Sequence, residues 1–230
     1  MSDTVFTDDV RAQARELIDR YPVPRSALLP LLHLVQSVEG YVSPAGVGFC
    51  AEQLGLTKAE VGAVATFYTM YKRRPTGDYL VSVCTNTLCG MLGGDEIYAR
   101  LKSDLGVGHD ETTADGTITL EHAECLAACD YAPVVTVNYE FFDKQSSDSA
   151  VGLVAALRRG ERPAPTRGAP LCTFREIERQ LAGLGDERAD AVAANAGGTE
   201  TFAGLTLAAE RSEVAPAYPG GGIPAGEGSS

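Results

Sequence analysis

Four of the six cysteines in this 230-residue sequence occur as two pairs, and these pairs are its strongest chemical signal. Four residues separate Cys84 from Cys89, and three separate Cys125 from Cys129. Each pair sits where an apolar, strand-like run gives way to a turn rich in Gly or Ala, so we expect the four sulfurs to converge at the ends of neighbouring strands. Thiolates are the soft ligands that hold zinc ions and iron–sulfur clusters. The four cysteines therefore predict a metal site.

The spacing favours two irons over one zinc ion, but it leaves both open. Zinc sites prefer close pairs with about two intervening residues, although up to about four are tolerated. A [2Fe-2S] rhomb is longer than a single ion and suits wider pairs, one pair on each iron. Burial as inert core residues is the less favoured interpretation of these four cysteines. For Cys50 and Cys172, which stand alone, it is the favoured one.

Small residues beside the sulfurs have a predicted role. We expect their backbone N–H groups to approach sulfur and to raise the reduction potential of a bound cluster. Glu124 and Asp130, each next to a cysteine, would lower that potential if they faced the cluster. The small residues are Gly90, Gly93, Gly94, Ala127 and Ala128.

The first 75 residues are predicted to form a helical lobe, delimited by cap residues and glycines. The lobe exits through the aromatic residues Phe67, Tyr68 and Tyr71. We favour a core role for them and keep an interface anchor as the alternative. The expected helices cover residues 8–21, 27–38 and 44–54, and a fourth opens at a capping box at residues 57–60.

A thioredoxin-like domain is predicted to follow, from residue 76 to residue 160. A parallel strand pair spanned by a helix, followed by a hairpin and a further helix, is the outline of such a sheet. The expected elements are strands at 79–83 and 117–120, a helix capped by Asp95, a hairpin of 133–137 with 140–142, and a helix at 147–159.

The predicted fold class is α+β: an N-terminal helical bundle, a thioredoxin-like α/β domain and an irregular C-terminal extension. In the extension, residues 161–230, we expect one helix at 173–182. Its remainder is rich in Ala, Gly and Pro and is predicted to be disordered or laid over a partner.

Composition excludes several functions. The net charge of −12 argues against nucleic-acid partners, and no segment is apolar enough for a signal peptide or a membrane span, so we expect a cytoplasmic protein without direct membrane insertion. No phosphate-binding loop and no nucleophile–base pair occurs, so we expect no nucleotide site and no catalytic residue. We assign no role to the histidines, because His33 and His122 have no partner at ligand spacing and His109 lies in a turn rich in Gly and Asp.

The cysteine motifs resemble those of a known family. They are Val83-Cys84-Thr85-Asn86-Thr87-Leu88-Cys89 with Gly93-Gly94, and Glu124-Cys125-Leu126-Ala127-Ala128-Cys129 with Ala132-Pro133-Val134-Val135. Together they are similar to the thioredoxin-like 2Fe-2S ferredoxin subunit of respiratory complex I, the NuoE or 24-kDa family. The resemblance covers roughly residues 7–160, and Ala127 stands where the family often has Gly.

The resemblance implies a subunit of the proton-translocating NADH:quinone oxidoreductase, with one 2Fe-2S cluster held by Cys84, Cys89, Cys125 and Cys129. The partner would be the flavin subunit, which binds FMN and NADH and exchanges electrons with this cluster. In the family the helical lobe contacts that subunit. The chain would then lie at the inner face of the cell membrane through the complex, with no active site of its own.

Two other functions stay open at this point. A diaphorase subunit of an NAD-linked hydrogenase or formate dehydrogenase would have the same fold and cluster. A zinc-stabilised interaction module would have no redox role. A thiol–disulfide oxidoreductase is less favoured, because no C-x-x-C motif begins the first helix of the sheet domain.

Overall fold

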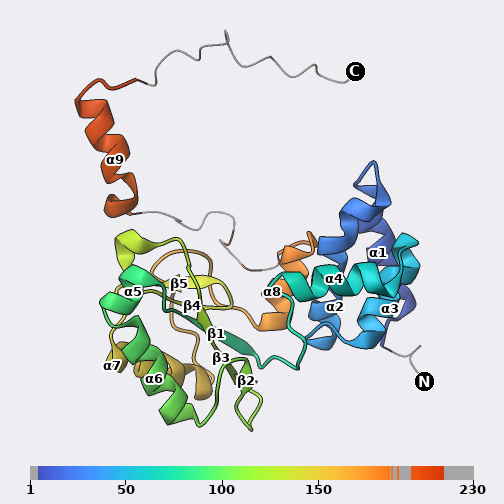
Figure 1. The fold of residues 1–230 in the computed structure, drawn as a ribbon, viewed down its shortest axis with the longest axis horizontal. Helices are drawn as coiled ribbons and strands as arrows, with labels where there is room; N and C mark the ends of the chain where they lie inside the picture. The colour runs from blue at the N-terminus through green and yellow to red at the C-terminus, as the bar shows by residue number, and fades with distance from the viewer. Residues whose placement is uncertain (1–4, 187, 189–190, 192–197, 215–230) are drawn as a thin grey trace. The chain divides into compact units, whose positions relative to one another are not determined.

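A computed structural model describes residues 5–186, 188, 191 and 198–214 (Figure 1). The chain divides into two compact units, residues 1–196 and residues 197–230. The larger unit contains every cysteine and histidine of the sequence. The candidate metal site therefore lies within it.

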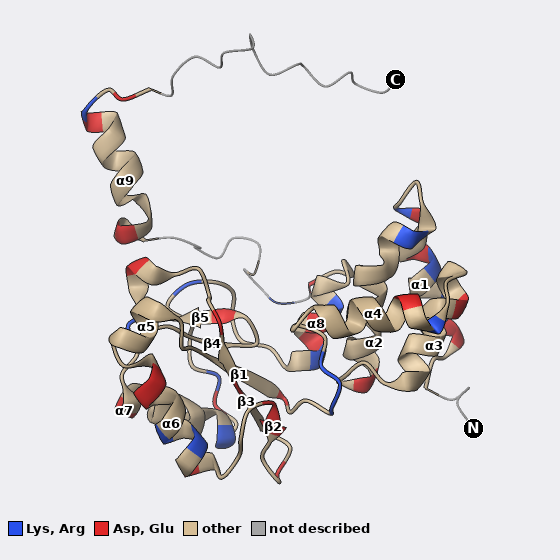
Figure 2. Ribbon diagram, viewed as in Figure 1, with Lys and Arg blue, Asp and Glu red and all other residues tan. Residues whose placement is uncertain are grey.

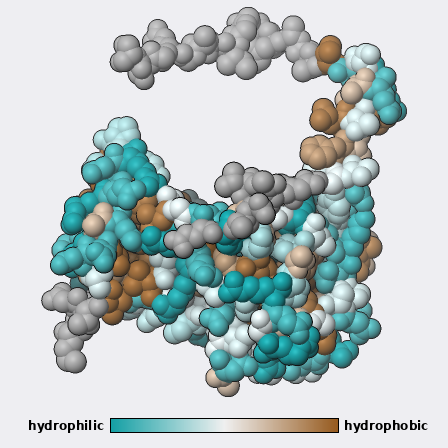
Figure 3. Space-filling model, turned by 180° about the vertical axis from the view of Figure 1, so that it is seen from behind, coloured by the Kyte–Doolittle hydropathy of each residue, from teal (hydrophilic) through white to brown (hydrophobic). Residues whose placement is uncertain are grey.

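The smaller unit contains helix α9, Thr199–Glu210, which was not predicted. Figure 2 shows its acidic residues towards its two ends, with uncharged residues between them. Phe202 and Leu205 are 51% and 69% exposed, and Figure 3 shows hydrophobic side chains at the surface of this helix. The last part of the predicted irregular tail, residues 215–230, lies outside the described residues.

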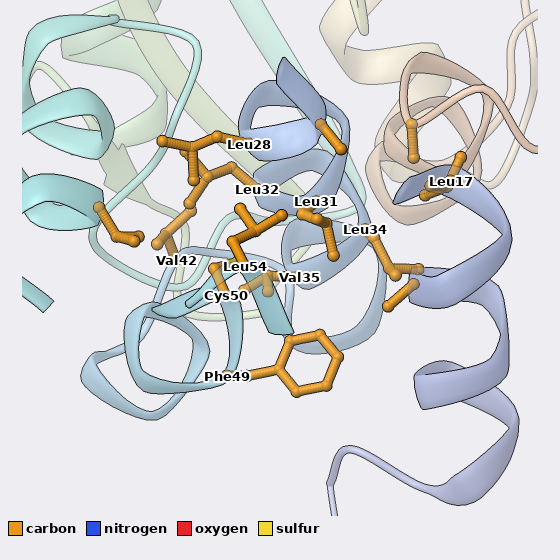
Figure 4. Packing of buried hydrophobic residues seen from close by; sticks show 14 of the residues in the cluster. Leu17, Leu28, Leu31, Leu32, Leu34, Val35, Val42, Phe49, Cys50 and Leu54 are labelled. Atoms are coloured by element: carbon orange, nitrogen blue, oxygen red, sulfur yellow. The ribbon is translucent and has the colours of Figure 1, made fainter. Parts of the chain in front are cut away.

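The N-terminal lobe folds around one apolar core, as predicted. Figure 4 shows Leu34 and Val35 of α2 close to Phe49 and Cys50 of α3, and all four side chains are buried. Burial of one large apolar side chain contributes about 1.5–3 kcal/mol, so the apolar face of α2 holds the lobe together. The elements are α1 (Asp8–Asp19), the 3-10 helix η1 (Pro24–Ala27), α2 (Leu28–Glu39), α3 (Pro44–Leu54) and α4 (Lys58–Phe67).

Local chemistry sets the limits of these helices. The side chains of Thr7, Ser43 and Thr57 accept hydrogen bonds from backbone N–H groups in the first turns of α1, α3 and α4. Gly40 and Gly55 end α2 and α3 in the left-handed conformation, with φ of 80° and 63°. These caps confirm the predicted boundaries.

The aromatic residues at the end of α4 and after it are not all core residues. Tyr71 is buried, and its hydroxyl donates to the carbonyl of Leu29 at 3.1 Å. Phe67 and Tyr68 are 77% and 40% exposed. The core prediction is therefore confirmed for Tyr71 and wrong for Phe67 and Tyr68. Phe67, the last residue of α4, lies away from the helix face that buries Ala65, and Tyr68 follows it in extended backbone.

In the described part of the chain, five strands form one sheet in the order β2-β3-β1-β4-β5. β1 and β3 are parallel and the other neighbours antiparallel, which confirms the predicted strand–helix–strand unit and hairpin. Only β2, two residues long, was not predicted. The strands are β1 (Tyr79–Cys84), β2 (Glu111–Thr112), β3 (Ile118–Ala123), β4 (Val135–Val137) and β5 (Glu140–Phe142).

Two helices, α6 (Gly94–Leu105) and α7 (Ser147–Arg158), pack on one face of the sheet. Alternate residues of β1, such as Val81 and Val83, enter this core. α6 begins one residue before Asp95, because Gly93 occupies the N-cap position at φ 113°; the predicted cap at Asp95 is therefore wrong. Asp95 instead lies in the first turn.

The other face of the sheet meets the C-terminal extension. Leu80 of β1 packs with Cys172, Phe174 and Ile177, of which the last two belong to α8 (Phe174–Leu181). α8 is the helix predicted at 173–182, and it also packs against α2. The division of the chain at residues 75 and 160 stays a prediction.

A buried polar network ties the lobe, the sheet and α8 together. The carboxylate of Glu178 in α8 is fully buried and accepts hydrogen bonds from Gln36 of α2 at 2.9 Å and from the hydroxyl of Tyr139 at 3.0 Å. His33 Nδ1 lies 2.5 Å from the same carboxylate. At the predicted boundary, the buried ammonium of Lys72 pairs with Asp110 and Glu121 of the sheet region.

Replacement of Asn138 should weaken the whole larger unit. Its buried side chain accepts from the N–H of Leu80 and donates to the carbonyls of Asp78 and Cys172, at 2.7–2.9 Å. Asn138→Ala removes these bonds and places Ala at φ 46°, so we expect the free energy of unfolding to fall by about 3–5 kcal/mol in chemical denaturation.

Asn138→Gly is the matched control for backbone strain. It loses the same hydrogen bonds but tolerates the positive φ, so it should be about 1 kcal/mol more stable than the alanine variant. If either variant has the same denaturation midpoint as the wild type, the hydrogen bonds of Asn138 contribute little to the free energy of unfolding.

Candidate metal centre

The first pair of cysteines is built into regular structure. Cys84 is the last residue of β1, and its N–H donates to the carbonyl of Val134 at 3.1 Å. Cys89 lies in α5 (Thr87–Met91), a short helix that was not predicted. Both side chains are buried. The predicted position of this pair at the end of a strand is confirmed.

The second pair lies on a loop after β3. Cys125 follows the strand by two residues, and Cys129 opens the 3-10 helix η2 (Cys129–Tyr131). Both are exposed. Because β1 and β3 are parallel and Cys84 is opposite Ala123, both pairs leave the sheet at the same edge.

The structure brings the four thiols to one pocket. Cys84, Cys89, Cys125 and Cys129 line it together with apolar neighbours that include Leu126 and Val134. All four thiols are free of disulfide bonds. Among the described residues, no three Cys, His, Asp or Glu side chains are grouped as a single metal ion would need. Four thiolate donors have the soft character that both iron–sulfur clusters and zinc ions require, so the donor set fits either group.

The small residues serve the site in different ways. The N–H of Ala127 donates to the Cys125 sulfur at 3.3 Å, which is the predicted kind of contact. Ala127 does so at φ 53°, a region that favours glycine. The N–H groups of Gly90 and Gly93 instead donate to the carbonyls of Asn86 and Gly90. The role predicted for these two glycines is therefore not observed.

Gly94 is required for close packing. A Cβ at this position would lie 2.4 Å from the carbonyl oxygen of Cys84 and 2.9 Å from that of Cys89. Only glycine allows the first turn of α6 to approach both ligand candidates this closely. This steric role, rather than an N–H group pointing at sulfur, explains its place beside the first pair.

The electrostatics of the metal-free site favour the protonated form of the Cys89 thiol. Burial, a hydrogen bond with the Cys84 thiol and the proximity of Cys84 and Cys129 raise the pKa of Cys89 to about 11. Metal binding must therefore displace protons, so its affinity depends on pH. Glu124 and Asp130 are both exposed, so water screens their charges.

The remaining cysteines and the histidines take no part in this pocket. Cys50 and Cys172 are core residues, as predicted, and burial raises the pKa of Cys50 to about 12 and that of Cys172 to about 11. His33 has a structural role that was not predicted, as the neighbour of buried Glu178. The signal in the sequence was Glu178 itself, which shares the apolar side of α8 with Phe174 and Ile177.

The parallel β1–β3 unit, the hairpin and the flanking helices define a thioredoxin-like fold with a thiol-lined pocket at one edge of its sheet. Residues 14–158, more than half of the chain, match the model of the thioredoxin-like [2Fe-2S] ferredoxin family. The chain belongs to this family.

Curated relatives extend the match along the chain. It is 62% identical over 211 residues to the E subunit of NADH-quinone oxidoreductase from Mycobacterium tuberculosis, covering 92% of this chain and 83% of that protein. It is 37% identical over 160 residues to NADH-quinone oxidoreductase subunit 2 of Thermus thermophilus, covering 68% and 88%. The first match leaves only 19 residues of this chain outside it, so it includes α9.

A solved structure shows the likeness of fold alone. An air-oxidised NAD+-reducing [NiFe]-hydrogenase aligns with a TM-score of 0.52 at 18% identity, over 58% of this chain and 23% of that chain. Within the described residues, no helix has the length and apolar character that crossing a lipid bilayer requires.

Gly94→Ala should disrupt the metal centre. The added Cβ would collide with backbone oxygen atoms that cannot rotate away, so α6 or the cysteine backbone must move. We expect less iron and acid-labile sulfide per chain, and a free energy of unfolding lowered by about 1–3 kcal/mol.

Gly152→Ala in α7 is the matched control, because nothing lies within 4 Å of its added Cβ. Its helix should be unchanged or up to about 1 kcal/mol more stable, with full iron content. Equal iron content in both variants would show that Gly94 is not needed for site geometry.

Proposed function

We propose that Cys84, Cys89, Cys125 and Cys129 hold one [2Fe-2S] cluster, and that the chain is an electron-transfer subunit of NADH:quinone oxidoreductase. The observation that carries the proposal is the meeting of four free thiols in one pocket at the edge of a thioredoxin-like sheet. Each pair would ligate one iron. When bound, the cluster supplies a carrier for one electron.

The fold buries the first cysteine pair of this site and leaves the second pair exposed. β1 and α5 enclose Cys84 and Cys89, while Cys125 and Cys129 are exposed. The N–H of Ala127 stabilises negative charge on the Cys125 sulfur and favours the reduced form. Electrons would therefore pass through the side that carries the exposed pair.

The surface beside the cysteines fits a protein partner. Residues 79–94 contain no charged residue, and Figure 2 shows α5 without charge. On and after α5, Leu88, Met91 and Leu92 are 40%, 79% and 55% exposed. This uncharged face lies in a chain of net charge −12, so the partner should present an apolar patch within a basic surrounding.

The partner we propose is the flavin subunit, which would bind FMN and NADH. Exposed Phe67 and Tyr68 on the helical lobe provide a second contact, since aromatic residues are enriched in interfaces. The chain itself would carry no catalytic residue. It would lie in the peripheral arm on the cytoplasmic side of the membrane, held there by the other subunits of the proton-translocating complex.

One alternative has a specific observation in its favour. The structural likeness to an NAD+-reducing hydrogenase is compatible with a diaphorase subunit of a hydrogenase or formate dehydrogenase. The 62% identity to the mycobacterial NADH-quinone oxidoreductase protein, over 92% of the chain, favours the quinone oxidoreductase. A zinc-stabilised module is less favoured, because the family to which the chain belongs is that of the thioredoxin-like [2Fe-2S] ferredoxins.

Low-temperature EPR of the reduced, isolated chain tests the cluster. We expect a rhombic one-electron signal that is lost in Cys125→Ser, because one iron loses a thiolate ligand. Cys50→Ala and Cys172→Ala, which replace buried cysteines outside the pocket, should keep the signal. Colourless protein with stoichiometric zinc would overturn the proposal.

Met91→Asp tests the uncharged face. A carboxylate at the most exposed residue of this face should weaken association with the flavin subunit about tenfold or more, measured by titration of the two purified subunits. Val23→Asp changes another exposed apolar residue, 58% exposed in the helical lobe, and should bind as the wild type does. The EPR signal should be unchanged in both. Equal affinities of the two variants for the flavin subunit would show that the uncharged face is not part of the interface.

A further inference from the structure

Arg167 contacts two aromatic rings in the region that follows the second cysteine pair. Its guanidinium carbon is 4.7 Å from the centre of the Tyr131 ring and 4.3 Å from that of Phe141. Nε and Nη2 donate to the two carboxylate oxygens of Asp143 at 3.0 and 3.1 Å. The Arg167 and Asp143 side chains are only 15% and 7% exposed, so water screens this pair weakly.

Tyr131 connects Arg167 to Cys129. The 3-10 helix η2 begins at Cys129 and ends at Tyr131, whose N–H donates to the carbonyl of Ala128 at 2.9 Å. The carbonyl of Tyr131 accepts from the N–H of Lys144, also at 2.9 Å. The Tyr131 ring packs with Ala128 and Val134, which both line the cysteine pocket. A shift of this ring would therefore move the backbone that holds Cys129.

The second pair needs such support more than the first. A strand and a helix hold Cys84 and Cys89, whereas residues 124–128 form neither helix nor strand. The side chains of Cys125 and Cys129 are also exposed, so core packing does not fix them. A planar guanidinium held by one carboxylate and two rings supplies a rigid contact at this place.

Arg167 comes from outside the region matched by the family model, residues 14–158. Its segment is fastened to the hairpin. The N–H of Thr166 donates to the carbonyl of Phe141 at 2.9 Å, and its hydroxyl donates to Asp143 at 2.8 Å. Arg167 itself forms an isolated β-bridge with Phe141.

We propose that Arg167 is a positioning residue for the metal centre, which acts through Tyr131 to fix the turn that carries Cys129. The C-terminal extension then takes part in the site, although it supplies no ligand. The inference rests on the proposed function only where iron is concerned, because the contacts themselves involve protein atoms alone.

Hydrogen exchange of the metal-free full chain tests the contact directly. In Arg167→Ala, amides of residues 126–132 should exchange about tenfold faster than in the wild type. Arg167→Lys keeps the charge but loses the planar fork, so it should give an intermediate rate. Arg158→Ala is the matched control, because it removes an arginine–carboxylate pair of the same kind elsewhere on the sheet domain. Arg158 donates through Nε and Nη2 to Asp115 at 3.1 and 2.9 Å.

EPR and iron release of the metal-loaded chain give the second measurement. Arg167→Ala should broaden the signal and release iron to a chelator about tenfold faster, while Arg158→Ala behaves as the wild type does. The inference would be overturned if the amides of residues 126–132 exchanged at the wild-type rate in Arg167→Ala. An equal rise in exchange rate throughout the chain would also overturn it. A local rise in exchange in a chain that never binds iron would support the contact and refute the proposed function.

Discussion

The parallel pairing of β1 with β3 determines where the cysteines meet. Cys84 lies opposite Ala123, so the first pair leaves one strand at the edge from which the second pair leaves the next. A slip of one residue would turn each side chain of a strand to the opposite face and remove from the core the residues that now pack against α6 and α7. The apolar core therefore fixes the register, and the register fixes the metal centre.

Local signals predicted much of this arrangement, and contacts between distant residues account for what was missed. Caps and glycines set helix limits within a few residues, so α1 to α4 could be read directly. The requirement at Gly94 comes from two carbonyl oxygens that approach only after folding. The partners of Glu178 lie more than 35 residues away along the chain, so their identity depends on tertiary structure. β2 is too short to show a periodic pattern.

Buried polar groups link the helical lobe of the larger unit to its sheet. The helical lobe and the sheet have separate hydrophobic cores. Glu178 contacts the lobe through Gln36 and the hairpin through Tyr139, and an unpaired carboxylate at this depth would be strongly destabilising. Movement of the lobe relative to the sheet must therefore break several bonds together, which explains why residues 1–196 form one compact unit.

The unequal burial of the two cysteine pairs has a consequence for the order of biogenesis. Cys84 and Cys89 are enclosed by the fold, so iron and sulfide must enter past Cys125 and Cys129. In the proposed complex, the flavin subunit covers the neighbouring uncharged face. Electrons are proposed to leave through the side of the exposed pair, so the same partner would also close this route. Maturation of the metal centre should then precede recruitment into the enzyme.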